Sequence, residues 1–263
     1  MTIVLNEHEW AKEAIDSRSI GDKPFETLYR VAKYYFDEGY KRSDVRKLLD
    51  AFLMRCDPCA SLSKWSNTLD RAVTKAQKYE TIMVDKIPVS ITELEKVNAI
   101  EGKQVRRLAF TLLCLAKYFD AINPNANHWV GMQDKDIMKL ANINTSVMRQ
   151  GMMYHTLNEL GMIQFSKKVD NTSVRVCFID DGETAFEIRD MRNIGYQYLM
   201  LTGSKDYMTC QCCGNTVKYS GKVYGRRKKY CTACASEIAL RQNVKSVLKR
   251  REAQKTSPVF VGN

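Results

Sequence analysis

The order of structural elements is decided by residues 134–179, which read DKDIMKLANINTSVMRQGMMYHTLNELGMIQFSKKVDNTSVRVCFI. Apolar spacing predicts a short helix over 134–141 and a longer helix over 145–160, with a tight turn between them. Gly161 follows the longer helix, where a left-handed C-cap is expected. Two strand-like runs, 162–168 and 173–179, then flank a polar turn, so the sequence predicts a β-hairpin.

A long amphipathic helix over 103–122 and a short strand over 128–130 are predicted upstream of this stretch. Helix, strand, short helix, turn, longer helix and hairpin is an order that resembles the winged variant of the helix-turn-helix. The resemblance covers residues 101–182 and is strongest in 136–144, 145–160 and 158–163. It implies that helix 145–160 enters a DNA major groove and that hairpin 167–175 lies over the phosphate backbone.

This resemblance assigns roles to individual side chains. We expect four residues of helix 145–160 to be buried: Val147, Tyr154, Leu157 and Leu160. The residues expected to face outward are Ser146, Arg149, Gln150, Met153 and His155. Arg149 could pair with guanine and Gln150 with adenine, because their side chains match those base edges bidentately. Three cations of the hairpin would neutralise phosphates: Lys167, Lys168 and Arg175. The alternative is that the winged helix is a protein–protein adaptor, because a fold does not fix a function.

Four of the nine cysteines have the spacing of a metal site. They form two C-x-x-C pairs, Cys210 with Cys213 and Cys231 with Cys234. Zinc takes four thiolates in a tetrahedron, and each tight pair supplies two sulfurs on one side of the ion. The pattern resembles a zinc ribbon and predicts one structural Zn²⁺, with Cys212 as a bystander. A closed four-thiolate site leaves no open position for catalytic water.

The other cysteines receive simpler interpretations. Cys56 and Cys59 also spell C-x-x-C, but no second pair follows them at a suitable spacing, so they are expected to be incidental thiols at a helix end. Cys114 and Cys177 lie in apolar runs and are expected to fill the core.

Positive charge is concentrated at the C-terminal end of the chain. From Asp206 onward, twelve Lys and Arg residues face three carboxylates, a net charge of +9, whereas residues 1–205 carry 29 cations and 27 carboxylates. Such asymmetry points to a polyanionic partner, with nucleic acid as the default. The cations expected to contact phosphates there are Arg226, Arg227, Lys228, Lys229, Arg241 and Lys245. The last two lie on a predicted helix over 235–253.

The remaining sequence predicts a mainly α protein with a small β content. Residues 1–100 read as an N-terminal helical domain, with amphipathic helices predicted over about 24–39, 43–57 and 61–79. Thr92 and Glu95 have capping-box spacing at the start of a further short helix. The winged-helix domain (101–182), a connecting segment (183–205), a zinc-binding basic module (206–256) and a tail (257–263) follow. No P-loop, Rossmann or metalloprotease motif is present, so we expect no enzyme activity. The absence of a signal peptide or a long apolar run predicts a cytoplasmic protein, in a bacterium or host cell, that does not enter membranes.

These features predict a nucleic-acid-binding protein, for DNA rather than RNA, that acts in replication or transcription control. The combination of domains is similar to that of nucleic-acid-binding proteins carried by phages and mobile elements. The alternative hypothesis is a non-enzymatic inhibitor or adaptor that binds a nucleoprotein complex. The sequence leaves the oligomeric state open.

Overall fold

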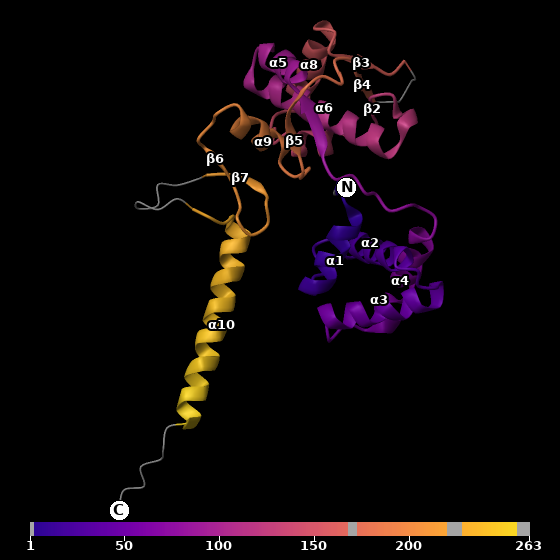
Figure 1. Ribbon diagram of the computed structural model, residues 1–263, viewed down its shortest axis with the longest axis vertical. Helices are drawn as coiled ribbons and strands as arrows, with labels where there is room; N and C mark the ends of the chain where they lie inside the picture. The colour runs from indigo at the N-terminus through magenta and orange to yellow at the C-terminus, as the bar shows by residue number, and fades with distance from the viewer. Residues whose placement is uncertain (1–2, 168–172, 220–227, 257–263) are drawn as a thin grey trace, which may run out of the picture.

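The computed structural model describes residues 3–167, 173–219 and 228–256, and side chains as far as residue 248. Its described part is mainly helical, with small antiparallel sheets and two separate hydrophobic cores. The first core lies inside a bundle of four helices, α1 (Glu7–Ser17), α2 (Pro24–Asp37), α3 (Arg42–Cys56) and α4 (Leu62–Ala76) (Figure 1). The amphipathic periodicity of residues 24–76 correctly predicts three of these helices. Asn6 caps the fourth, α1, by accepting a hydrogen bond from the Glu9 amide.

A buried ion cluster ties the bundle together. Glu7 at the start of α1 is almost fully buried and lies 2.6 Å from the ammonium of Lys33 and 3.3 Å from the guanidinium of Arg30, both on α2. Its carboxylate also accepts a hydrogen bond from the amide of Ile82, and Lys33 donates to the carbonyl of Glu80. The cluster therefore joins α1, α2 and the chain that leaves α4.

The second core surrounds α6 (Lys103–Ile122), whose bounds agree with the predicted helix. Packed on it are α5 (Ile91–Ala99), α7 (Asp134–Leu140) and α8 (Val147–Glu159). A sheet of order β2–β4–β3 joins β2 (Trp129–Val130), β3 (Ile163–Phe165) and β4 (Val174–Val176), all antiparallel, and the short η1 helix (Pro124–Ala126) precedes β2. The predicted hairpin is thus confirmed, with a third strand added beside β4.

The segment 183–205, expected to be a connection, is folded. Its β5 strand (Thr184–Ile188) pairs antiparallel with β1 (Ile87–Ser90), and its α9 helix (Ile194–Leu201) packs on α6. The pairing of β5 with β1 could not be predicted from the sequence, because both strands are short and they lie almost a hundred residues apart in the chain.

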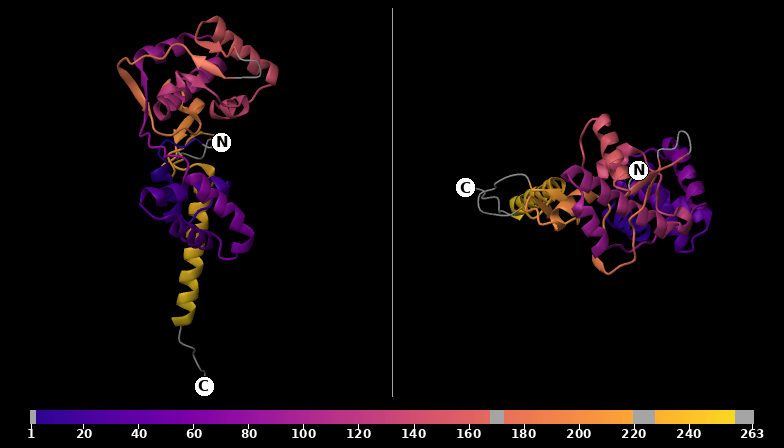
Figure 2. Two further views of the ribbon diagram at one scale, coloured as in Figure 1. Left: turned by 90° about the vertical axis from the view of Figure 1, so that its right-hand side faces the viewer. Right: turned by 90° about the horizontal axis from the view of Figure 1, so that it is seen from above.

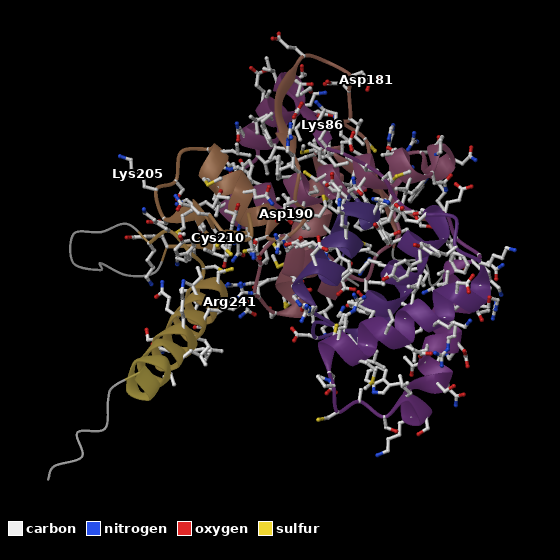
Figure 3. The ribbon with its side chains drawn as sticks, turned by 60° about the horizontal axis from the view of Figure 1, so that its bottom comes forward. Lys86, Asp181, Asp190, Lys205, Cys210 and Arg241 are labelled. Atoms are coloured by element: carbon white, nitrogen blue, oxygen red, sulfur yellow. The ribbon has the colours of Figure 1, made fainter. Side chains whose placement is uncertain are left out.

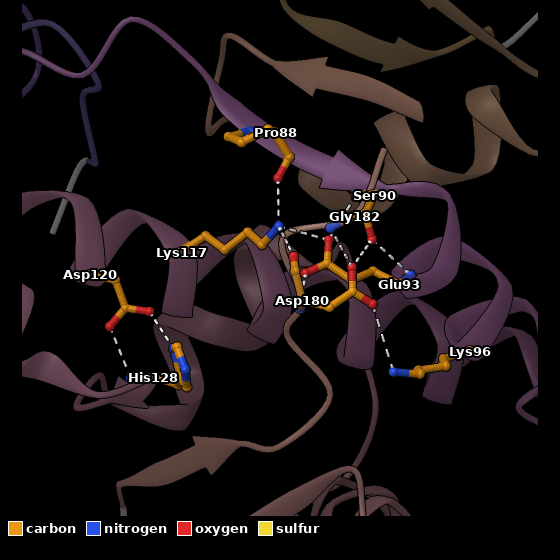
Figure 4. A network of polar contacts seen from close by, with 9 residues as sticks. All are labelled: Pro88, Ser90, Glu93, Lys96, Lys117, Asp120, His128, Asp180 and Gly182. Atoms are coloured by element: carbon orange, nitrogen blue, oxygen red, sulfur yellow. Dashed lines mark hydrogen bonds and ion pairs between the residues drawn. The ribbon is translucent and has the colours of Figure 1, made fainter. Parts of the chain in front are cut away.

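A buried carboxylate fixes the junction between β1, α5 and α6 (Figure 4). Glu93 is fully buried and accepts hydrogen bonds from the amides of Ser90 (2.8 Å) and Asp180 (3.0 Å) and from the ammonium of Lys117 (2.7 Å). Ser90 and Glu93 form the capping box of α5, so the prediction that Thr92 and Glu95 form it is wrong. Both pairs have the required spacing, and the helix begins earlier because β1 ends at Ser90.

The C-terminal part consists of the hairpin β6 (Tyr207–Thr209) and β7 (Thr216–Lys218) and the long helix α10 (Thr232–Thr256). In the right-hand view of Figure 2, β6, β7 and α10 lie to one side of the other elements. In Figure 1, α10 projects away from both cores. Among the described residues, no helix is both long and apolar enough to cross a membrane.

Candidate metal centre

The two C-x-x-C pairs come together at the base of α10. The sulfurs of Cys210, Cys213, Cys231 and Cys234 all lie within 4.8 Å of one another, and those of Cys213 and Cys231 are 3.9 Å apart. A tetrahedral zinc with Zn–S bonds of ~2.3 Å separates its sulfurs by about 3.8 Å. The four cysteines are therefore positioned to hold one metal ion, and their donor set and spacing fit zinc.

Each pair is placed by its own backbone element. The first lies in the turn between β6 and β7, which is closed by hydrogen bonds from the Cys210 amide to the Asn215 carbonyl and from the Gly214 amide to the Cys210 carbonyl, both 2.9 Å. Gly214 has φ +69°, a conformation that glycine adopts without strain. The second pair flanks the first turn of α10, where the helix dipole stabilises thiolates. A bond from the Gln211 amide to the Lys229 carbonyl joins the two halves.

The protonation of the thiols is uneven in the absence of a cation. Burial opposes ionisation of Cys210, but its sulfur accepts hydrogen bonds from the amides of Cys231, Cys213 and Cys212, which lower the pKa to about 6. The hydrogen bond with the Cys231 sulfur, together with burial, raises the pKa of Cys234. A metal ion that binds here must displace protons, so its binding is linked to pH.

An arginine outside the cluster supports the first pair. Arg192 donates a hydrogen bond to the carbonyl of Cys213 (2.6 Å), and Asp190 holds its guanidinium at 2.7 Å. The hydrogen bonds to Asp190 raise the pKa of Arg192, and the cationic side chain would offset the negative charge of four thiolates bound to a metal ion. In Figure 3, Cys210 lies beside the start of α10, with Arg241 further along that helix.

A chain of asparagines connects the metal centre to the second core. Asn193, at the start of α9, donates to the Asn215 side chain (2.9 Å) and to the carbonyl of Thr216 (3.0 Å). Its own side-chain oxygen accepts from Asn142 (2.8 Å), in the turn between α7 and α8. Arg107 of α6 donates to the carbonyl of Asn142 (3.0 Å). The sequence gives no signal for this connection, because Asn142 and Asn193 look like ordinary turn residues.

Helix α8 faces the core with a different side from the one predicted. Tyr154 and Leu157 are buried as expected, but Val147 is 82% exposed and Leu160 is also exposed, so those two predictions are wrong. Met153, expected to face outward, is only 6% exposed and packs in the core. Apolar residues occur around most of this helix, so their spacing alone does not identify the buried side.

The candidate nucleic-acid contacts are distributed over several elements. Arg149, Lys167 and Arg175 are exposed; the Ser146 side chain caps α8 by accepting from the Arg149 amide, and the half-buried Gln150 donates to the carbonyl of Thr145. Lys228, Lys229, Arg241 and Lys245 are exposed, with Arg241 paired to Glu237 at 2.6 Å. Lys168, Arg226 and Arg227 lie outside the described residues.

The remaining cysteines differ in their exposure. Cys212 lies outside the four-sulfur cluster and is exposed, in agreement with its expected role as a bystander. Cys114 is buried in the core, but Cys177 is exposed, so its interpretation as a core residue is wrong. Cys56 is half-buried and Cys59 exposed; burial raises the pKa of Cys56, which makes that thiol less reactive.

No family model, no curated protein and no solved structure matches the chain.

Proposed function

We propose that the protein binds nucleic acid, DNA in preference to RNA, and acts in the control of replication or transcription without enzyme activity. One observation carries the proposal. The four-cysteine cluster lies at the base of a projecting 25-residue helix, in the part of the chain that carries a net charge of +9. Zinc would fix Lys228 and Lys229 next to α10, whose exposed cations include Arg241 and Lys245. A rigid cationic surface of this kind suits a phosphate backbone.

The order α6, β2, α7, α8, β3 and β4 supports the further proposal of a winged-helix domain. In that arrangement Lys167 and Arg175 of the hairpin would contact phosphates. Of the three residues proposed to read bases or position the helix on DNA, only Arg149 has a side chain without a bond inside the described structure, since Ser146 caps α8 and Gln150 is held by Thr145. Sequence reading by α8 would therefore rest mainly on Arg149.

The test is the salt dependence of affinity for DNA and RNA. Each phosphate contact contributes about −0.9 to the slope of log K against log salt for duplex DNA. Replacing Arg226, Arg227, Lys228 and Lys229 by alanine should flatten the slope by up to about 3–4 units. The matched control removes four exposed lysines of the helical bundle, Lys12, Lys47, Lys64 and Lys78, which changes the net charge equally.

An unchanged slope in the first variant, or equal flattening in both, would contradict phosphate contact by this run. Negligible affinity of the wild-type protein for naked nucleic acid would favour the adaptor that binds a nucleoprotein complex. The apolar outward face of α8 is the observation that favours a protein contact of some kind.

A further inference from the structure

The outward face of α8 is a self-complementary apolar surface. Met148, Met152, Thr156 and Leu160 follow one another at four-residue spacing and form one ridge along the helix. Met148 is 78% exposed, Met152 58% and Leu160 55%, although α8 lies within the folded part of the chain and packs on α6. A contiguous row of exposed apolar side chains is a feature typical of protein interaction surfaces.

The ridge has few groups that could bind a nucleic acid. Methionine and leucine side chains offer no hydrogen-bond donor to phosphates or base edges. The hydroxyl of Thr156 already donates to the carbonyl of Met152 at 3.0 Å. The chemistry of this face therefore suits an apolar protein surface.

An apolar cavity lies at the C-terminal end of the same ridge. It measures about 610 Å³ and opens between the end of α5, the end of α8 and the segment after β4. Its walls include Ile100, Leu160, Met162 and Phe178. A long, flexible methionine side chain is well suited to fill a cavity of this kind.

We propose that α8 packs antiparallel against α8 of a second copy of this chain, about a two-fold axis at the level of Tyr154. Ten residues separate Arg149 from Glu159. The two-fold axis brings Arg149 to the level of Glu159 of the second copy, and Met148 to the level of Leu160 of the second copy, at the mouth of its cavity. A two-fold interface has to be self-complementary in this way.

The charges select this occupant and this orientation. Neither Arg149 nor Glu159 forms an ion pair within the described part of the chain. Parallel helices would place like charges at the same level, whereas the antiparallel pair places a cation at the level of a carboxylate at both ends. In this dimer Arg149 contacts the second copy, so α8 can use Arg149 to read a base only as the monomer.

The experiment measures the oligomeric state of the full, zinc-loaded chain by sedimentation velocity across a concentration series, after removal of nucleic acid. We expect a reversible dimer that Met152→Glu converts to monomer. Gln164→Glu is the matched control, because it adds the same charge at an exposed position of β3 outside the ridge, and it should leave the dimer intact. A cooperative thermal unfolding transition of Met152→Glu would show that this variant is folded, as the exposure of Met152 predicts.

Charge reversal tests the orientation. Arg149→Glu and Glu159→Arg should each weaken the dimer by about tenfold or more, and the double variant should restore it. A monomer at every concentration, a dimer insensitive to Met152→Glu, or a double variant no tighter than the single variants would overturn the proposal. Because nucleic acid is absent from this assay, its outcome is independent of the salt-dependence test of nucleic-acid binding.

Discussion

Gly195 allows α9 to approach the turn between α7 and α8 more closely than any other residue would. A Cβ atom added to Gly195 would lie 1.9 Å from the carbonyl oxygen and 2.5 Å from the carbonyl carbon of Ala141. Ordinary contacts of this kind exceed about 3.2 Å, so the two segments would have to separate by more than about 1 Å. The obstacle is backbone and cannot rotate away, and Ala141 itself is fully buried.

Gly195→Ala should therefore destabilise the protein by about 3 kcal/mol, at the upper end of the range for an overpacked core. The matched control is Gly151→Ala. This glycine is also helical, and no atom beyond its chain neighbours and the backbone of its own helix lies within 4 Å of an added Cβ. The substitution should therefore stabilise the protein by roughly 0.5–1 kcal/mol through helix propensity. Chemical denaturation gives both free energies of unfolding from the shift in midpoint. A Gly195→Ala variant within about 1 kcal/mol of wild type would refute the reasoning, because it would show that α9 moves freely over the turn.

Three further predictions concern the metal centre, the buried ion cluster and the asparagine chain. Elemental analysis of the wild-type protein should give about one zinc ion per chain; Cys213→Ser should lose this zinc, whereas Cys212→Ser should retain it. Metal loss in the second variant would show that the ligand set is wrong. Glu7→Gln should cost about 3–5 kcal/mol in denaturation experiments because it removes the carboxylate that the buried ammonium of Lys33 contacts at 2.6 Å. The exposed Glu9→Gln should change stability by less than about 0.5 kcal/mol. Asn193→Gly tolerates the φ of +51° found at this position but removes three side-chain hydrogen bonds. Amides of the β6–β7 hairpin should therefore exchange faster with deuterium, while zinc is retained. Unchanged exchange would show that the hairpin is held by other contacts.

Local regularities of the sequence predict the elements of this fold well. The apolar spacing of residues 103–122 yields helix α6 with its observed bounds, and two C-x-x-C pairs identify four sulfurs that the fold brings together. In both cases the signal lies within one short segment. The periodicity of a helix and the spacing of a C-x-x-C pair are both set by the geometry of residues that are neighbours in the chain, so they can be recognised without knowledge of the tertiary structure.

The predictions that were wrong depend on contacts between distant segments. Whether Met153 or Val147 of α8 faces the core is decided by the position of α6 and the sheet, since either side of the helix offers apolar residues. Strand β5 and helix α9 carry weak local patterns, and each is stabilised by a partner far away in the chain. Tertiary contacts override weak local preference in such segments.

The asparagine chain makes the metal centre more than a local support for α10. Asn193 bonds the β6–β7 turn that carries the first cysteine pair, and it also bonds Asn142, which lies in the turn that leads into α8. An ion that orders the β6–β7 turn would therefore also order the partners of Asn193, and through Asn142 the turn that leads into α8. The hydrogen bonds of Asn193 are 2.8–3.0 Å long. A shift of the β6–β7 hairpin on metal loss would therefore either break these bonds or move the turn between α7 and α8. One connected set of hydrogen bonds thus links the hairpin that carries the first cysteine pair to the turn before α8.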